Sequence, residues 1–170
     1  RLTGEELRAT IGTRRDVGII VASGGSTNAG VIDDLAGCAD VAEQTGAWLH
    51  VDGAYGLATV LLPELRGRFR GIERADSFIV DPHKWLFAPF DCCALLYREP
   101  ELARAAHAQS AGYLEPLQGE EWNPSDYAVN LTRRARGLPF WFSLAAHGTD
   151  AYAQAVEQTL EVARYAAAEI

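Results

Sequence analysis

Val17-Gly18-Ile19-Ile20-Val21-Ala22 is a continuous apolar run of strand length, followed directly by the small-residue loop Ser23-Gly24-Gly25-Ser26-Thr27-Asn28-Ala29-Gly30. A strand that is apolar at every position is typical of a parallel sheet covered on both faces. After the loop, Asp33 or Asp34 is expected to cap a helix that ends at Gly46. This stretch therefore predicts a strand–loop–helix unit of an α/β fold.

The rest of the chain repeats this alternation. Further strands are predicted at 48–51, 77–80 and 92–97. Helices are predicted after Thr3, which begins a capping box with Glu6, then at 63–75, at about 100–108, and from about 138 onward with an interruption at Gly148-Thr149-Asp150. Residues 109–131 are polar with little periodicity and are expected to form a loop. Strands that alternate with helices predict an α/β domain with a mainly parallel sheet flanked by helices.

Composition narrows the possible functions. The 170 residues are 48% apolar with a net charge of −8, and they show no basic stripe, so we expect neither nucleic acid nor a membrane as a partner. The three cysteines are expected to be reduced thiols of a cytoplasmic protein, with Cys92 and Cys93 in the core, and no metal site is predicted. The chain begins at Arg1, lacks Met and ends in a helix-like stretch, so we expect it to be a piece of a longer protein.

Lys84 is the only lysine among 15 basic residues. An arginine cannot replace a lysine where the chemistry needs an amine that releases its proton. Lys84 follows a predicted strand, Asp52 ends another, and Ser26-Thr27 follows a third. Because ligands collect at the carboxyl ends of parallel strands, these groups are predicted to meet at one edge of the sheet.

An amine, a carboxylate and hydroxyl groups in this arrangement match the needs of pyridoxal 5'-phosphate. The amine forms a Schiff base with the cofactor aldehyde, and the carboxylate keeps the pyridine nitrogen protonated. Small residues beside the carboxylate, Gly53 and Ala54, leave room for a flat ring.

Two motifs carry a family resemblance, namely His50-Val51-Asp52-Gly53-Ala54-Tyr55-Gly56 and Pro82-His83-Lys84-Trp85-Leu86. With the later segment Arg133-Arg134-Ala135-Arg136-Gly137-Leu138, they resemble the group II pyridoxal-phosphate-dependent amino-acid decarboxylases, which include the aromatic-L-amino-acid decarboxylases. The resemblance covers most of residues 16–148. It implies a type I fold, with residues 1–137 as the C-terminal half of the cofactor-binding domain and 138–170 as a helical connection into a small domain.

The resemblance also assigns roles to individual residues. Lys84 would form the aldimine and Asp52 would pair with the pyridinium nitrogen. Tyr113, in the loop, would protonate the substrate carbon. Ala54 would lie against the ring, and the remaining cofactor-binding residues would be His83, Thr27 and Ser26. Asp81 stands where many relatives have Asn; since a negative charge near a phosphate is unfavourable, Asp81 is expected to point elsewhere or to meet an arginine.

The function implied is decarboxylation of an L-amino acid to the amine and CO2 by a homodimer. A carbon–carbon lyase or an aminotransferase-like enzyme on the same fold is the alternative within this cofactor class. An aminotransferase would need Lys84 itself to shuttle the proton. A non-catalytic relative is the alternative outside it, although an idle site has no chemical need for Asp52 and Lys84.

Overall fold

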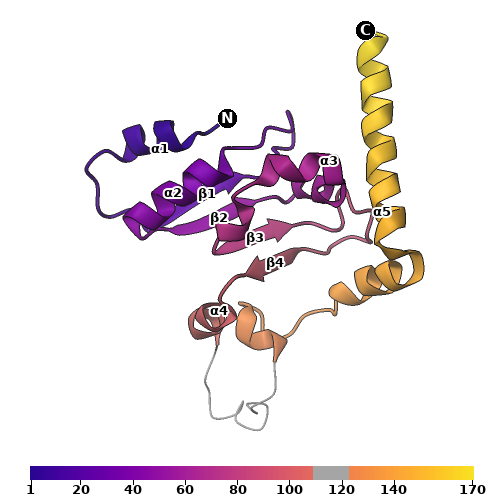
Figure 1. Ribbon diagram of the computed structural model, residues 1–170. Helices are drawn as coiled ribbons and strands as arrows, with labels where there is room; N and C mark the ends of the chain where they lie inside the picture. Colours follow the sequence, from indigo (N-terminus) through magenta and orange to yellow (C-terminus); the bar gives the residue numbers. More distant parts are fainter. Residues whose placement is uncertain (109–122) are drawn as a thin grey trace. The chain divides into compact units, whose positions relative to one another are not determined.

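A four-stranded sheet forms the centre of the computed structural model, which describes residues 1–108 and 123–170 (Figure 1). The strands lie in the order β1-β2-β3-β4. Their bounds are Ile19–Ser23, Trp48–Asp52, Ser77–Val80 and Ala94–Tyr97. The chain divides into two compact units, residues 1–96 with 136–170, and residues 97–135.

The first three strands are parallel and in close register. Ser23 of β1 lies opposite Asp52 of β2, and Asp52 lies opposite Ile79 of β3. The arrow of β4 points the other way in Figure 1, which makes the sheet mixed but mainly parallel. The predicted α/β fold class is confirmed, and the carboxyl ends of β1, β2 and β3 meet at one edge.

The two N-terminal helices begin where their capping residues predict. Thr3 and Glu6 form a capping box at the start of α1 (Gly4–Ile11). Asp34 is the cap of α2 (Leu35–Thr45) and accepts a hydrogen bond from the Gly37 amide at 3.0 Å. The neighbouring Asp33 instead accepts hydrogen bonds from the amides of Leu2 and Ser23 and so joins the chain start to β1. Gly46 ends α2 in the left-handed conformation.

The main core lies between α2 and the first two strands. Its most deeply buried side chains come from α2, from β1 and β2, and from the segment after β2. They include Ala22, Cys38, Val41, Leu49, Val51 and Phe69. Burial of these side chains fixes the sheet against α2 and holds the strand ends in place. Cys92 is buried as predicted, but Cys93 is exposed and precedes β4, so its predicted core position is wrong.

The helix predicted at 63–75 is broken into short pieces. After the 3-10 turn η1 (Gly56–Leu61), the chain forms α3 (Pro63–Arg66), η2 (Gly67–Phe69) and η3 (Ile72–Arg74). Gly71 interrupts the helical path with a φ of 103°, and a Cβ there would collide with the backbone of Ala36 in α2. The close approach of this segment to α2 therefore overrides its local helical pattern.

A kinked helix, α5 (Gly137–Ala168), completes the first unit. Gly148 is non-helical, with φ 74° and ψ 166°, at the predicted interruption. Beyond the kink, Tyr152 and Val156 are buried, and Tyr152 packs in a second core cluster with Ala58 and Leu86. The predicted division of the chain at residue 137 stays a prediction.

The second unit contains α4 (Pro100–His107) and the 3-10 turn η5 (Pro124–Tyr127). Arg104 of α4 pairs with Asp126 of η5 at 3.2 Å, which links these two elements. Among the residues that the structure describes, no helix has the length and apolar character needed to cross a membrane.

Candidate active site

Backbone hydrogen bonds fasten the three strand ends together. The Gly24 amide donates to the Asp52 carbonyl at 2.7 Å, and the Gly53 amide donates to the Ile79 carbonyl at 3.1 Å. Farther out, the Asp81 amide donates to the Ala54 carbonyl at 3.1 Å. The segments that carry Asp52 and Lys84 are therefore joined by main-chain bonds, as the strand-end argument predicts.

Glycine is required where these segments touch. A Cβ on Gly53 would lie 2.5 Å from the Leu57 Cβ and 3.0 Å from the Ile79 carbonyl oxygen. Gly25, with a φ of 112°, approaches Gly56 just as closely. Close backbone packing thus explains why Gly53 and Gly56 follow Asp52. The sequence predicts a further role for the small residues at this point, which is to leave room for a flat ring.

Asp52 presents its carboxylate at the edge of the sheet. The side chain is exposed, and its Oδ1 accepts a hydrogen bond from the Ala54 amide at 3.1 Å. This bond orients the carboxylate above the turn that follows β2. The arrangement suits a carboxylate that has to meet a cationic group of a ligand.

Lys84 lies beyond the end of β3 and pairs with a carboxylate. Its Nζ is 2.9 Å from Oδ2 of Asp81, and the side chain of Lys84 is 38% exposed whereas that of Asp81 is 12% exposed. The Lys84 amide also donates to the Asp81 carbonyl, which closes a tight turn around Pro82. Asp81 therefore meets Lys84, three residues away, and not the expected arginine; the expectation that Asp81 points away from the cofactor phosphate stays a prediction.

His83 is held by the segment before β4. Its Nδ1 lies 2.6 Å from the Cys92 carbonyl oxygen, and its ring contacts Phe90 edge-to-face at 5.0 Å. A carbonyl oxygen only accepts, so Nδ1 carries the proton of this bond. The ring of His83 is thereby fixed beside Lys84.

Stacked aromatic rings join the two motifs a second time. Tyr55, which follows Ala54, stacks on Trp85, which follows Lys84, with ring centroids 5.1 Å apart and planes 24° apart. The Trp85 indole N–H donates to the Thr159 hydroxyl of α5 at 2.8 Å. Sequence reasoning missed this bridge, although the aromatic residue directly after each predicted site residue was a usable signal.

The loop after β1 supplies the predicted hydroxyl groups. The Ser26 Oγ accepts a hydrogen bond from the Val31 amide at 3.1 Å and so holds the loop together. Thr27 is exposed. Tyr113, the predicted proton donor, lies outside the described residues.

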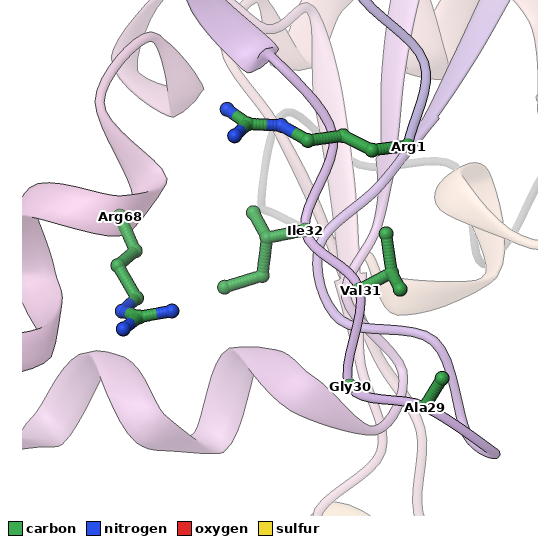
Figure 2. Close-up of a pocket in the computed structure, with 6 residues that line it drawn as sticks. All are labelled: Arg1, Ala29, Gly30, Val31, Ile32 and Arg68. Atoms are coloured by element: carbon green, nitrogen blue, oxygen red, sulfur yellow. The ribbon is translucent and has the colours of Figure 1, made fainter.

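A surface pocket lies beside the same loop (Figure 2). It has a volume of about 410 Å³, and its lining consists of Arg1, Ala29, Gly30, Val31, Ile32 and Arg68. Figure 2 shows two arginine side chains bordering an otherwise apolar wall. None of the predicted site residues lines this pocket, so the candidate active site is the strand-end cluster itself.

Comparison with known proteins identifies the family. The model of the pyridoxal-dependent decarboxylase conserved domain matches residues 1–170. The chain belongs to the pyridoxal-dependent decarboxylase family. The predicted family and its pyridoxal cofactor are therefore confirmed.

Individual members of the pyridoxal-dependent decarboxylase family are similar to most of this chain. An aromatic-L-amino-acid decarboxylase of Bacillus atrophaeus is 33% identical over 147 residues, 85% of the chain and 31% of the relative. A phenylacetaldehyde synthase of a Rosa hybrid cultivar is 34% identical over 154 residues, 86% of the chain and 30% of the relative. The crystal structure of mouse CSAD has a TM-score of 0.87 and 30% identity, covering the whole chain and 37% of that protein. The chain thus spans about a third of these relatives.

Proposed function

We propose that the protein containing this chain converts an L-amino acid to the amine and CO2 with pyridoxal 5'-phosphate. The observation that carries the proposal is the joining of two neighbouring strand ends, one bearing Asp52 and the other the chain's single lysine. Membership of the pyridoxal-dependent decarboxylase family supports the same reaction.

The residues present fit the cofactor. Lys84 supplies a partly exposed primary amine, and Asp52 supplies an exposed carboxylate. A hydroxyl at Thr27 is exposed in the adjoining loop, and Ala54 adds no bulk beside the carboxylate. We assign Lys84, Asp52, Ala54, His83, Thr27 and Ser26 to cofactor binding.

Each residue has a distinct task in the proposed reaction. When bound, the cofactor supplies an electron sink for the pair of electrons left by CO2. Asp52 would keep the ring nitrogen of the cofactor protonated, which makes the ring a better electron sink. Lys84 would hold the cofactor through its primary amine. His83, fixed through Nδ1, positions the backbone next to Lys84.

Tyr113 is proposed to deliver the proton to the carbon that loses CO2. Replacement by Phe removes the hydroxyl and should lower amine formation by roughly 10²–10⁴-fold while cofactor binding persists. Unchanged amine formation in Tyr113→Phe would leave Tyr113 without this role. A homodimeric state and a cytoplasmic location are part of the proposal and are supported by the family assignment alone.

One of the similar proteins is named a phenylacetaldehyde synthase, so the product, amine or aldehyde, has to be identified by experiment. The complete reading frame that contains this sequence should be expressed, loaded with pyridoxal 5'-phosphate and given a panel of L-amino acids. We expect equal amounts of CO2 and amine from at least one substrate. Release of CO2 together with an aldehyde in place of the amine would indicate an aldehyde synthase. Turnover without CO2 would exclude decarboxylation.

Attachment of the cofactor is tested separately. Borohydride reduction followed by peptide mapping should place the pyridoxyl label on the peptide containing Lys84. A label elsewhere in the protein would contradict the proposed role of this lysine. The variant Arg70→Lys is a matched control, because it adds a second amine at an exposed position and should leave the label on Lys84.

A further inference from the structure

Lys84 is the exposed member of a segment whose other side chains are held by the fold. His83 and Trp85, on either side of it, are half-buried, and Leu86 is buried in the second core cluster. His83 is also bonded to the segment before β4. The backbone around Lys84 is therefore fixed by its neighbours, while the amine stays accessible.

Trp85 is held from two sides by distant parts of the chain. One face of its ring stacks on Tyr55, which belongs to the segment after Asp52, with ring centroids 5.1 Å apart. Its indole N–H donates to the Thr159 hydroxyl at 2.8 Å, in the part of α5 beyond the kink at Gly148. Trp85 thus joins the lysine segment both to the carboxylate segment and to α5.

The Thr159 hydroxyl is set up as an acceptor by its own helix. It donates its single proton to the Val156 carbonyl at 2.7 Å, so its oxygen is left to accept the indole N–H of Trp85. Val156 is completely buried, which fixes this turn of α5 against the rest of the first unit. The position of the acceptor is therefore decided by the packing of α5.

This anchor bears on the chemistry proposed for Lys84. The amine sits on a flexible four-carbon stem, so the place it can reach depends on where the backbone holds that stem. A displacement of about 1 Å at a reacting group can cost as much as about 10²-fold in rate. Loss of the bond between Trp85 and Thr159 would let the lysine segment shift while leaving the amine itself intact.

We propose that Trp85 and Thr159 are positioning residues, through which α5 holds Lys84 where its amine meets the aldehyde of the cofactor. The inference rests on the proposed role of Lys84 as the cofactor lysine. It gives α5, which lies far from Lys84 in the sequence, a direct part in building the candidate active site.

The test measures how fast the cofactor attaches to Lys84 in the complete protein. Cofactor-free protein is mixed with pyridoxal 5'-phosphate and reduced with borohydride at successive times, and peptide mapping gives the attachment rate. Thr159→Val keeps the size of the side chain but removes the acceptor, so this rate should fall about tenfold. Thr159→Ser returns a hydroxyl and should restore the wild-type rate.

A second variant removes the other end of the same bond. Trp85→Phe keeps an aromatic ring against Tyr55 but has no N–H, so it should slow attachment by the same factor as Thr159→Val. The double variant should be no slower than either single one, because both remove one interaction. Effects that multiply in the double variant would overturn the proposal.

Thr45→Val is the matched control for a general loss of stability. Thr45 is a half-buried threonine of α2 whose hydroxyl likewise donates to a carbonyl of its own helix, that of Val41 at 2.8 Å. Thr45→Val should lower the stability to chemical denaturation about as much as Thr159→Val and leave the attachment rate unchanged. Equal slowing of attachment in both variants would overturn the positioning role.

The result separates this inference from the proposed function. A wild-type attachment rate in Thr159→Val overturns the inference, whether or not the protein releases CO2. Slower attachment in Thr159→Val of a protein that carries the label on Lys84 but releases no CO2 would support the inference and contradict only the decarboxylation. A wild-type protein without any label on Lys84 would contradict both.

Discussion

The ends of β2 and β3 each carry an aspartate, but in opposite surroundings. Asp52 is exposed, and its carboxylate accepts a hydrogen bond from the Ala54 amide in the turn that follows it. Asp81 is nearly buried and bonded to a cation, Lys84. The difference shows that the same residue type at neighbouring strand ends can serve two purposes, because the environment decides whether the carboxylate faces a ligand or another side chain.

The largest expected effect comes from removing the amine at the end of β3. Lys84→Arg keeps the positive charge beside Asp81 but cannot condense with an aldehyde. We expect cofactor attachment and CO2 release to fall below detection, measured by borohydride labelling and by CO2 trapping. Measurable turnover in Lys84→Arg would remove this lysine from the chemistry.

A smaller but still large effect is expected at the end of β2. Asp52→Asn keeps the shape of the side chain but cannot hold the ring nitrogen protonated, so kcat should fall by roughly 10²–10³ while the cofactor stays attached to Lys84. Steady-state kinetics and the borohydride label measure the two quantities separately. Asp16→Asn is a suitable control, since Asp16 is exposed and pairs with Arg14, two residues earlier in the chain. Wild-type kcat in Asp52→Asn would show that this carboxylate does not serve the ring.

The contact between the two strand ends is tested by Gly53→Ala. The added Cβ would press on Leu57 and on the Ile79 carbonyl, so the free energy of unfolding should fall by about 1–3 kcal/mol. Chemical denaturation of the complete protein measures this loss. Gly18→Ala serves as the control, because a Cβ at Gly18 meets nothing within 4 Å. Equal stability of the two variants would mean that the strand ends are not tightly packed.

The smallest expected effect concerns the interior of β2. Trp48 donates to the Ser77 hydroxyl, which in turn lies 2.8 Å from Nδ1 of His50. Burial lowers the pKa of His50, partly opposed by Asp52, so the folded protein favours the neutral ring. The contribution of the neutral His50 ring to the stability of the folded protein is therefore complete above the ordinary imidazole pKa of about 6.5. This contribution is lost as the pH falls below that value, because the unfolded chain then binds a proton more readily than the folded protein.

This pH dependence is measured by thermal unfolding at about pH 7.5 and pH 5.5. Wild type should lose more stability on acidification than His50→Gln, by roughly the 1 kcal/mol of one hydrogen bond. The exposed His147, replaced by Gln in the same way, should not change the pH dependence. An identical loss in wild type and His50→Gln would contradict a structural role for the neutral ring.

Much of the candidate site follows from local sequence. Apolar runs followed by small or polar residues locate the ends of β1, β2 and β3, because a buried strand and its turn are encoded in neighbouring residues. Parallel pairing then brings Asp52 and Lys84 to one edge. The pair of motifs around these two residues was also sufficient to indicate the family that the comparison confirms.

Other features depend on contacts between distant segments, which local patterns do not encode. The segment 63–75 reads as one helix, yet Gly71 turns away because it packs on the backbone of α2. The stacking of Tyr55 on Trp85 likewise joins residues 30 positions apart.

The sequence by itself determined which groups are available at the sheet edge, namely one amine, two aspartates and the hydroxyls of the first loop. Only the tertiary structure decided how the two aspartates differ. Asp81 lies three residues from Lys84, but its burial arises where the end of β3 meets Ala54 and the segment before β4. The ionic behaviour of a carboxylate is set by the solvent and partners left to it after packing, and these are properties of the folded chain.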